Sequence, residues 1–281
     1  MKIKQPKVKK IYDGTYAIED NGFGSVSVYM YLLVGKESSL VIDCGYGMLD
    51  LKNIIHQITD KPVVCACTHG HIDHALGAAQ FDETYLHSKD FPIYKAQSDP
   101  ELRRLAANYG LMGGVSKKKR SDPEYRAVVE RFASFPCPSQ LLPLDDVHEF
   151  ELGNRRIIWL PLPGHTPGSV MFYDEKYNVL FDGDAASATL WLHLEESLSL
   201  SEYRKNLIEY LDTVKQMGDP KRYAGHQLKP AGNKDLENLL YRVDKALTGH
   251  PFTIPFTTPF YHADILPAKG GMLFYDKKRL P

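Results

Sequence analysis

Residues 68–74 read THGHIDH, which places His69, His71, Asp73 and His74 within six positions. In an extended loop, residues two apart point to the same side, so His69 and His71 can reach one metal ion while Asp73 and His74 turn toward a second position. Burying four ionisable groups together without a cation is costly. The stretch therefore predicts a metal site, and imidazole with carboxylate suits zinc, with iron or manganese as alternatives.

The chain on either side of this stretch predicts a strand before it and a helix after it. The segment PVVCACTHG (62–70) is typical of a short buried strand, and ALGAAQF (75–81) has a helix-forming composition. Junctions at the carboxyl ends of strands are where sheets with helices place their ligands. We therefore expect the four side chains at one end of a sheet.

Four residues cannot complete two coordination shells, so further ligands are expected later in the chain. Three isolated residues follow predicted strands on turns that begin with glycine: His165 in LPGHTPGS, Asp184 in LFDGDAAS and His226 in YAGHQL. None of the three falls on a helical stripe. Their shared setting at strand ends predicts that they join the first four.

The order of predicted elements indicates the fold class. Strands are predicted at 14–20, 25–35 and 40–45, then a helix at 49–58; later strands are predicted at 148–153, 155–162, 169–175 and 178–184, then helices at 199–218 and 235–247. Strands followed by a helix thus occur twice. Two such halves packing their sheets together predict an α+β fold, a four-layer αββα sandwich.

Residues 88–140 differ in composition, with many Lys, Arg, Glu and Ala residues. The sequence Ser-Asp-Pro-Glu occurs at 98–101 and again at 121–124, which predicts two helix starts. About fifty residues with few large apolar side chains would make a poor core by themselves. We therefore interpret 88–140 as a helical insertion, and a possible cap over the site, within a single domain of residues 1–281.

Composition argues for a small-molecule partner. The formal charge is −1 and the sequence pI is about 6.8, which gives no electrostatic case for nucleic acid or an anionic membrane. Basic runs at 2–10 and 117–120 are interpreted as solvated. The first residues are charged where a signal peptide would be apolar, and no apolar run approaches the roughly 18 residues of a membrane span. We expect a soluble, cytoplasmic protein.

The chain has four cysteines, Cys44, Cys65, Cys67 and Cys137, without a Cys-x-x-Cys pair. Cys65 and Cys67 are two apart in an apolar run, which predicts that both lie on one face of a strand. Reduced, buried thiols are the prediction, and thiolate ligands of a metal are the alternative.

The combined pattern of HxHxDH, a Gly-His-Thr-Pro-Gly turn, an Asp after Phe-Asp-Gly and a later Gly-His resembles the metallo-β-lactamase-fold hydrolase superfamily over residues 12–230. The resemblance implies a two-metal site. It assigns His69, His71 and His165 to the first ion, Asp73, His74 and His226 to the second, and Asp184 as the bridge. Asp43 in VIDCG resembles the family's strand-end Asp, which supports the site without binding metal.

One departure narrows the expected chemistry. The best-known zinc β-lactamases carry Cys or Ser where this chain has Asp184, which disfavours antibiotic hydrolysis. The resemblance then favours the glyoxalase-II-like and lactonase-like branch, which cleaves small esters, thioesters or lactones. Two divalent ions, zinc first among them, would supply a bridging hydroxide, and Asp73 could pass the proton to the leaving group.

Several alternatives stay open. A phosphodiester or phosphonate hydrolase and a mononuclear-iron sulfur dioxygenase are other activities of this fold, and a non-catalytic metal-binding protein is a third class. Trp191 and His193 are candidate substrate-binding residues, against ordinary packing. The segment 252–271 is expected to be an irregular arm, and a homodimer formed through it or through the insertion is a further hypothesis.

Overall fold

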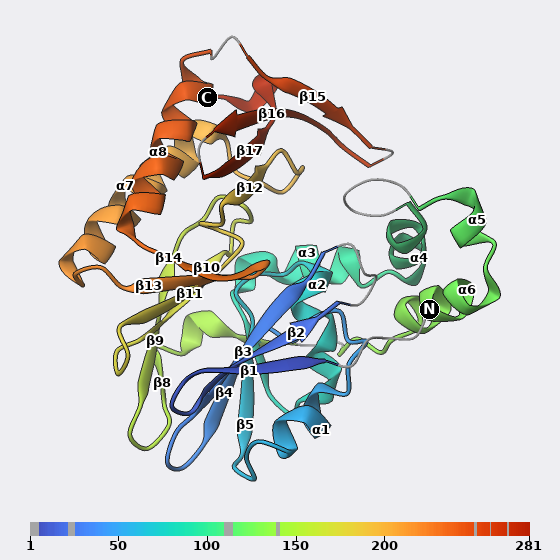
Figure 1. Ribbon diagram of the computed structural model, residues 1–281, viewed down its shortest axis with the longest axis vertical. Coiled ribbons are helices and arrows are strands. Elements are labelled where there is room, and N and C mark those ends of the chain that lie inside the picture. Colours follow the sequence, from blue (N-terminus) through green and yellow to red (C-terminus); the bar gives the residue numbers. More distant parts are fainter. Residues whose placement is uncertain are drawn as a thin grey trace. The chain divides into compact units, whose positions relative to one another are not determined.

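The computed structural model describes residues 6–21, 26–109, 115–138, 141–249, 252–258, 260–268 and 270–281. The chain divides into two compact units, Met1–Arg155 and Arg156–Pro281 (Figure 1). Each unit has its own hydrophobic core. The prediction of a single domain over 1–281 stays a prediction.

The sheet of the first unit has its seven strands in chain order. The strands are β1 (Lys7–Tyr12), β2 (Thr15–Asp20), β3 (Val28–Val34), β4 (Ser39–Ile42), β5 (Val63–Ala66), β6 (Thr84–Leu86) and β7 (Leu142–Pro143), and β8 (Glu149–Glu151) follows them. Neighbours from β1 to β4 are antiparallel, whereas β4 to β7 are parallel. All four residues of β4 are buried, as expected for a strand covered on both faces.

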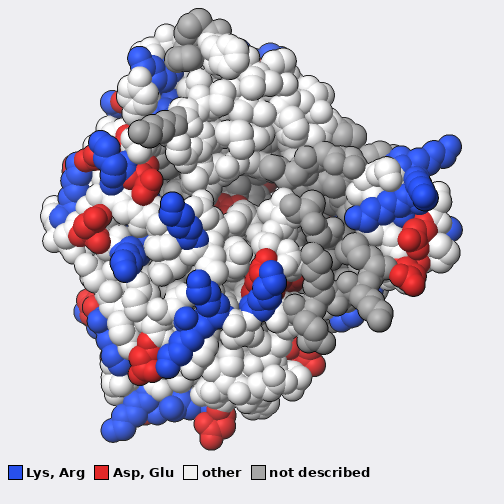
Figure 2. Space-filling view, in the orientation of Figure 1, with Lys and Arg blue, Asp and Glu red and all other residues white. Residues whose placement is uncertain are grey.

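β1 is the edge strand, and its lysines Lys7, Lys9 and Lys10 are exposed. Charged side chains on an edge strand oppose unwanted pairing with other chains. The run Lys117–Arg120 forms the short helix α5, where Lys117 and Lys118 are exposed. Figure 2 shows these basic side chains at the right of the view. The described lysines of the first run and the first two lysines of the second are thus exposed, as predicted, while Lys2 and Lys4 lie outside the described residues.

Six helices belong to the first unit among the described residues: α1 (Leu51–His56), α2 (Ile72–Ala75), α3 (Phe91–Gln97), α4 (Pro100–Tyr109), α5 and α6 (Pro123–Ala133). A 3-10 helix, Leu76–Gln80, follows α2 where the sequence predicted helix. α1 buries Leu51 and Ile55 and is shorter than predicted. His56 is exposed, since it lies off the apolar stripe.

Both predicted helix starts in the insertion are confirmed. α4 begins at Pro100, and Asp99 accepts a hydrogen bond from the backbone N–H of Leu102 (2.9 Å). α6 begins at Pro123 in the same way, with Asp122 as its N-cap. Asp and Pro at these positions satisfy or remove backbone donors that the first turn cannot pair. Whether the insertion caps the site stays a prediction.

The second unit contains two sheets and two long helices, α7 (Leu200–Gln216) and α8 (Asn233–Leu247). One sheet has the order β14-β13-β11-β10-β9 within this unit, and the other has the order β12-β17-β16-β15. The strands are β9 (Arg156–Pro161), β10 (Val170–Asp174), β11 (Val179–Gly183), β12 (Thr189–Leu192), β13 (Lys221–Ala224), β14 (Gln227–Ala231), β15 (Ile254–Thr257), β16 (His262–Ala268) and β17 (Gly271–Tyr275).

The helices α7 and α8 lie side by side and contribute to the core of this unit (Figure 1). α7 begins with a capping box, in which Ser199 and Glu202 each accept the backbone N–H of the other. The apolar face of α7 includes Leu207, Leu211 and Val214, all of which are buried. No helix among the described residues has both the length and the apolar character needed to cross a membrane.

The expectation of an irregular arm at 252–271 is wrong. This segment forms the hairpin of β15 and β16, followed by β17, which also pairs with β12. Its prolines suggested irregular structure, but Pro255 lies on the edge strand β15, and Pro267 lies beyond the last residue of β16 that pairs with β15. Proline is tolerated at such positions because the neighbouring strand does not need a backbone N–H donor there, and proline has none.

A buried ion pair joins the two parallel strands β11 and β13. The guanidinium of Arg222 donates to the carboxylate of Asp182, and both side chains are almost inaccessible. Burial raises the pKa of Asp182, and the charge of Arg222 opposes that shift. The pair fixes β11 beside β13, and each of these strands runs into a predicted ligand.

We predict that Asp182→Ala lowers the free energy of unfolding by about 3–5 kcal/mol, because Arg222 would be left buried without its counter-ion. Glu175→Ala is the matched control, since Glu175 pairs with Arg156 on the surface of the same unit. It should cost about 0–1 kcal/mol. Urea denaturation of the metal-free proteins measures both. Equal losses for the two variants would contradict a special role of the buried pair.

Candidate metal centre

The ligand loop of the first unit lies where two parallel strands end. β4 pairs with β5 in a register that puts Ile42 opposite Ala66. Asp43 leaves β4 at the same edge where residues 67–71 leave β5, and α2 begins at Ile72. The sheet register therefore brings Asp43 beside the ligand loop.

Asp43 organises this loop through three hydrogen bonds to one buried carboxylate. It accepts from the backbone N–H of Thr68 (2.7 Å), from the Thr68 hydroxyl (3.0 Å) and from Nδ1 of His74 (2.8 Å). Asp43 has a φ of 62°, in the left-handed region that Asp and Asn tolerate better than most residues. This backbone turn lets the side chain face the loop. The contacts agree with the supportive role that the resemblance implies for Asp43.

These bonds also set which ring nitrogen of each histidine carries its proton. Nδ1 of His74 donates to Asp43, so its lone pair lies on Nε2. The Thr68 hydroxyl gives its single proton to Asp43 and accepts from Nδ1 of His69 (3.0 Å). His69 therefore also has its lone pair on Nε2. Such oriented imidazoles are typical of metal ligands with a supporting second layer of hydrogen bonds.

The four predicted ligands of this unit lie together. The ring centroids of His69 and His71 are 4.8 Å apart, and those of His69 and His74 are 4.2 Å apart. Oδ2 of Asp73 lies 3.7 Å from Nε2 of His74. All three histidines are buried. A bound cation would offset the cost of burying these groups.

Two residues of the insertion hold the loop, and sequence reasoning missed both. Asp90 accepts the backbone N–H of Gly70 (2.8 Å), and Gln97 accepts that of Ile72 (3.1 Å). A Cβ at Gly70 would lie 2.7 Å from the carbonyl oxygen of Asp90, so only glycine permits this approach. No local signal marks either residue, because each lies about 20 residues from its partner.

In the second unit, His165 lies in the turn between β9 and β10. Its Nδ1 donates to the carbonyl of Trp191 in β12 (2.8 Å), which leaves the lone pair on Nε2. The Ser197 hydroxyl donates to the carbonyl of His165 (2.9 Å). A Cβ at Gly164 would lie 2.0 Å from the Tyr203 ring, so glycine lets α7 pack against this turn. His165 thus has the same orientation of its ring nitrogens as His69 and His74.

Asp184 and His226 leave neighbouring parallel strands. β11 pairs with β13 so that Gly183 lies opposite Ala224, and Gly183 has a φ of 51° that turns the chain out of the sheet. Nε2 of His226 is 3.0 Å from Oδ2 of Asp184. Nε2 of His165 is 3.8 Å from the same oxygen. The second unit thus brings its three predicted ligands together around one carboxylate.

The two candidate substrate residues belong to an aromatic cluster of the second unit. The ring of His193 lies 5.2 Å from Trp191, 4.7 Å from Tyr261 and 5.8 Å from Phe274. His193 is 5% exposed, and neither of its ring nitrogens has a hydrogen-bond partner among the described residues. Trp191 is next to the site because its carbonyl holds His165.

The family model described as the metallo-beta-lactamase superfamily matches residues 23–250. The chain belongs to this superfamily of metal-dependent hydrolases. Its α+β metallo-β-lactamase fold, the predicted four-layer αββα class, is shared with solved structures. DIM-1 metallo-β-lactamase has a TM-score of 0.55 at 16% identity, covering 88% of this chain and 100% of that one. A metallo-β-lactamase from Pontibacter korlensis has a TM-score of 0.56 at 18% identity, covering 85% and 99%.

Relatives found by sequence similarity are named as thioesterases or as probable metallo-hydrolases. Acyl-coenzyme A thioesterase MBLAC2 of Gallus gallus is 28% identical over 63% of this chain, a match that spans 64% of that protein. The Homo sapiens protein of the same name is 25% identical over 73% of this chain and 76% of its own length. Probable metallo-hydrolase YflN of Bacillus subtilis is 24% identical, covering 70% and 67%.

We predict that Asp43→Asn weakens binding of a divalent metal ion by about 10–100-fold, as expected for a residue that orients metal ligands. Asn tolerates the left-handed backbone, so the change removes a carboxylate acceptor without new strain. Asp60→Asn, an exposed carboxylate of the same unit, is the control. Competition with a coloured chelator measures the affinities. Equal affinity in both variants would refute this role of Asp43.

A second prediction concerns pH. The pKa of His193 is lowered from 6.5 to about 4, mainly by burial; the charges of His165 and His262 also lower it, and those of Glu196 and Asp276 oppose the shift. Between these values the unfolded chain binds a proton that the folded chain does not, so falling pH favours unfolding. The metal-free protein should lose roughly 2–3 kcal/mol more stability between pH 7.5 and 4.5 than His193→Gln does. An identical pH dependence, measured by urea denaturation, would contradict this.

Proposed function

We propose that His69, His71, Asp73, His74, His165, Asp184 and His226 hold two divalent metal ions in one centre, with zinc as the preferred metal and iron or manganese as alternatives. The observation that carries the proposal is the orientation of the imidazoles. His69, His74 and His165 each have Nδ1 engaged in a supporting hydrogen bond, which presents Nε2 as the donor atom. The assignment of residues to each ion follows the family resemblance.

The donor set fits a divalent metal of borderline softness. Five imidazoles and two carboxylates suit zinc and also permit iron or manganese, whereas magnesium and calcium prefer oxygen ligands throughout. Within each unit, the ligands approach one another closely enough for shared coordination. Removing the ions should leave a cluster of buried polar groups that destabilises each unit.

We propose hydrolysis of a small ester, thioester or lactone, with a thioester as the first choice. When bound, the ions would supply an activated water and polarise the substrate carbonyl. Asp73, at the start of α2, would hold the proton of that water and pass it to the leaving group. The Asp43 carboxylate and the Trp191 carbonyl would keep the imidazole rings of His74 and His165 in a fixed orientation during the reaction.

Two observations support the thioester. The relatives named acyl-coenzyme A thioesterase are 25–28% identical to this chain, which supports that substrate class loosely. Asp184 stands where the best-known β-lactamases differ, which favours the branch that cleaves esters, thioesters and lactones. A cytoplasmic enzyme with a small-molecule substrate and no nucleic-acid partner is consistent with the composition.

We further propose that Trp191 and His193 contact the substrate. The backbone carbonyl of Trp191 orients a proposed metal ligand, and its half-buried ring lies 5.2 Å from the ring of His193. The depressed pKa keeps His193 neutral at pH 7, when one ring nitrogen can donate and the other accept a hydrogen bond. His193→Ala should raise KM more than it lowers kcat if the residue binds the substrate.

The decisive experiment combines metal quantification with a substrate panel of acyl-coenzyme A, ester, lactone, β-lactam, phosphodiester and persulfide compounds. We expect two zinc ions per chain and turnover of an acyl thioester. His165→Ala and Asp184→Ala should lose about 1,000-fold in kcat/KM and part of the metal. His56→Ala, a change at an exposed histidine, should lose neither.

Other outcomes would reject the proposal in distinct ways. One iron per chain with oxygen uptake on the persulfide would indicate a sulfur dioxygenase. Turnover of only the phosphodiester would be consistent with the proposed metal centre but would refute the proposed substrate class. Near-normal hydrolysis by both alanine variants would refute the ligand assignment itself.

A further inference from the structure

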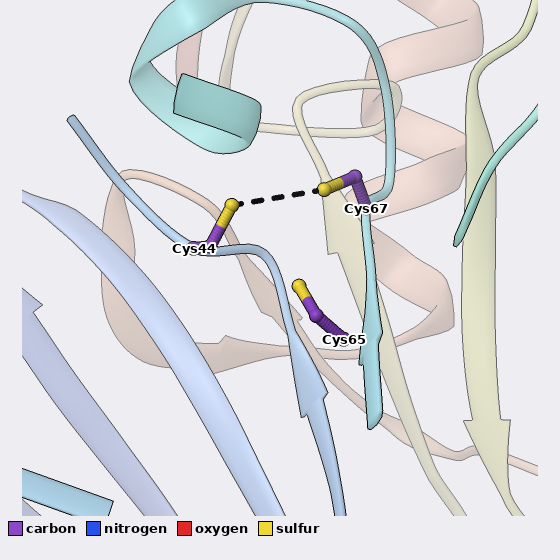
Figure 3. Close-up of side chains that lie close together, drawn as sticks. All are labelled: Cys44, Cys65 and Cys67. Atoms are coloured by element: carbon purple, nitrogen blue, oxygen red, sulfur yellow. Dashed lines mark hydrogen bonds between the residues drawn. The ribbon is translucent and has the colours of Figure 1, made fainter. Parts of the chain in front are cut away.

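Three buried cysteines converge directly behind the ligand loop (Figure 3). Cys44 follows β4, Cys65 lies in β5 and Cys67 follows β5. Their exposed fractions are 2%, 0% and 0%, and all three are free thiols. The Sγ atoms of Cys44 and Cys67 are 3.9 Å apart, and the three sulfur atoms lie within 4.8 Å of one another.

The sheet explains this convergence. Cys65 and Cys67 are two apart on an extended segment, so both side chains point to the same face, as the sequence predicted. β4 lies beside β5 in parallel, with Val41 opposite Cys65, and the chain turns after Ile42 so that Cys44 faces the same space. The sulfur atoms come from two strands and point toward one another. Packing alone requires apolar side chains here, but not three thiols.

We propose that Cys44, Cys65 and Cys67 form a binding site for one soft monovalent metal ion of the Cu(I) class. At a metal–sulfur distance of about 2.3 Å, planar three-coordinate geometry places the sulfur atoms about 4.0 Å apart. The observed 3.9 Å between Cys44 and Cys67 matches that spacing. The sulfur of Cys65 lies within 4.8 Å of both of these sulfur atoms.

The ligand type and number select the metal. Thiolate sulfur favours soft ions such as Cu(I), whereas structural zinc takes four ligands. Among the described residues, no histidine or carboxylate joins these three sulfur atoms in a group of that size. The three-sulfur arrangement therefore fits an ion that is stable with a coordination number of three.

The cysteines belong to a buried apolar cluster that includes Ile18, Leu32 and Leu86, where uncompensated charge is costly. A sulfur that binds the ion does so as a thiolate and releases its proton to solvent, and the positive charge of the ion then offsets part of the negative charge of the ligands.

The site is separate from the hydrolytic centre but shares backbone with it. The Cys44 thiol donates to the carbonyl of His74 (3.3 Å), and the backbone N–H of Cys44 donates to the same oxygen (2.7 Å). The sulfur atoms are not ligands in the proposed two-metal centre. The inference therefore does not rest on the proposed function, and either can fail alone.

The test measures copper in the full-length protein. Because the sulfur atoms are inaccessible, the protein is prepared in two ways: by synthesis in copper-supplemented cells, and by anaerobic incubation of the purified zinc-loaded protein with Cu(I) held by a weak chelator. Cys65→Ala and Cys65→Ser remove one ligand. Cys137→Ala is the control, since Cys137 is half-buried and lies outside the group of three.

We expect about one copper per chain in the parent and in Cys137→Ala, with X-ray absorption showing sulfur neighbours near 2.3 Å. Both Cys65 variants should bind Cu(I) at least about 100-fold more weakly, because a three-ligand site loses a third of its donors. Absorption of the unaltered protein decides the matter even if a variant folds poorly. Copper with nitrogen neighbours, or no retained copper in either preparation, would overturn the proposal and leave the thiols as core packing.

Discussion

The buried carboxylate of Asp43 is the constraint on which the first half of the site depends. A single side chain accepts hydrogen bonds from Thr68 and His74 and, through the Thr68 hydroxyl, orients His69. This buried carboxylate is tolerated because three donors, from Thr68 and His74, are directed at its oxygens. The same bonds that make Asp43 stable in the interior thus determine which ring nitrogens face a metal ion.

The second unit reaches the same result with a backbone carbonyl and an ion pair. The Trp191 carbonyl orients His165, and the pair of Asp182 and Arg222 holds together the strands that end in Asp184 and His226. In both units, neighbouring parallel strands deliver side chains to one sheet edge. Both units therefore use parallel strand pairing to bring the candidate ligands together. Neighbouring polar groups, such as the Asp43 carboxylate and the Trp191 carbonyl, then orient the imidazole rings.

The insertion contributes hydrogen bonds to the ligand loop. Asp90 and Gln97 bind the backbone of the ligand loop, so the start of the insertion acts as a support for His71 and its neighbours. The three thiols belong to the buried core beside the loop, where the Cys44 thiol donates to the carbonyl of His74. The loop is thus held by polar contacts from one segment and rests on sulfur atoms from two strands.

The sequence by itself determined the features that depend on a few neighbouring residues. These are the HxHxDH spacing, the candidate ligands placed after strands, the helix starts at Pro100 and Pro123, and the common face of Cys65 and Cys67. Caps, turns and alternation act over two to four residues, so their signals can be read locally. The order of strands and helices indicated the fold class, and the family resemblance then supplied the assignment of the seven candidate ligands to two ions.

Only the tertiary structure decided the contacts between distant segments. Examples are the hydrogen bond from Gly70 to Asp90 and the hydrogen bond from His165 to the Trp191 carbonyl. Others are the contact between the sulfur atoms of Cys44 and Cys67 and the sheet that β15 to β17 form with β12. Each depends on which strands pair and in which register, and that choice is made by the packing of the whole core. No short stretch of sequence contains this information, which is why the residues that support the ligands were harder to find than the ligands themselves.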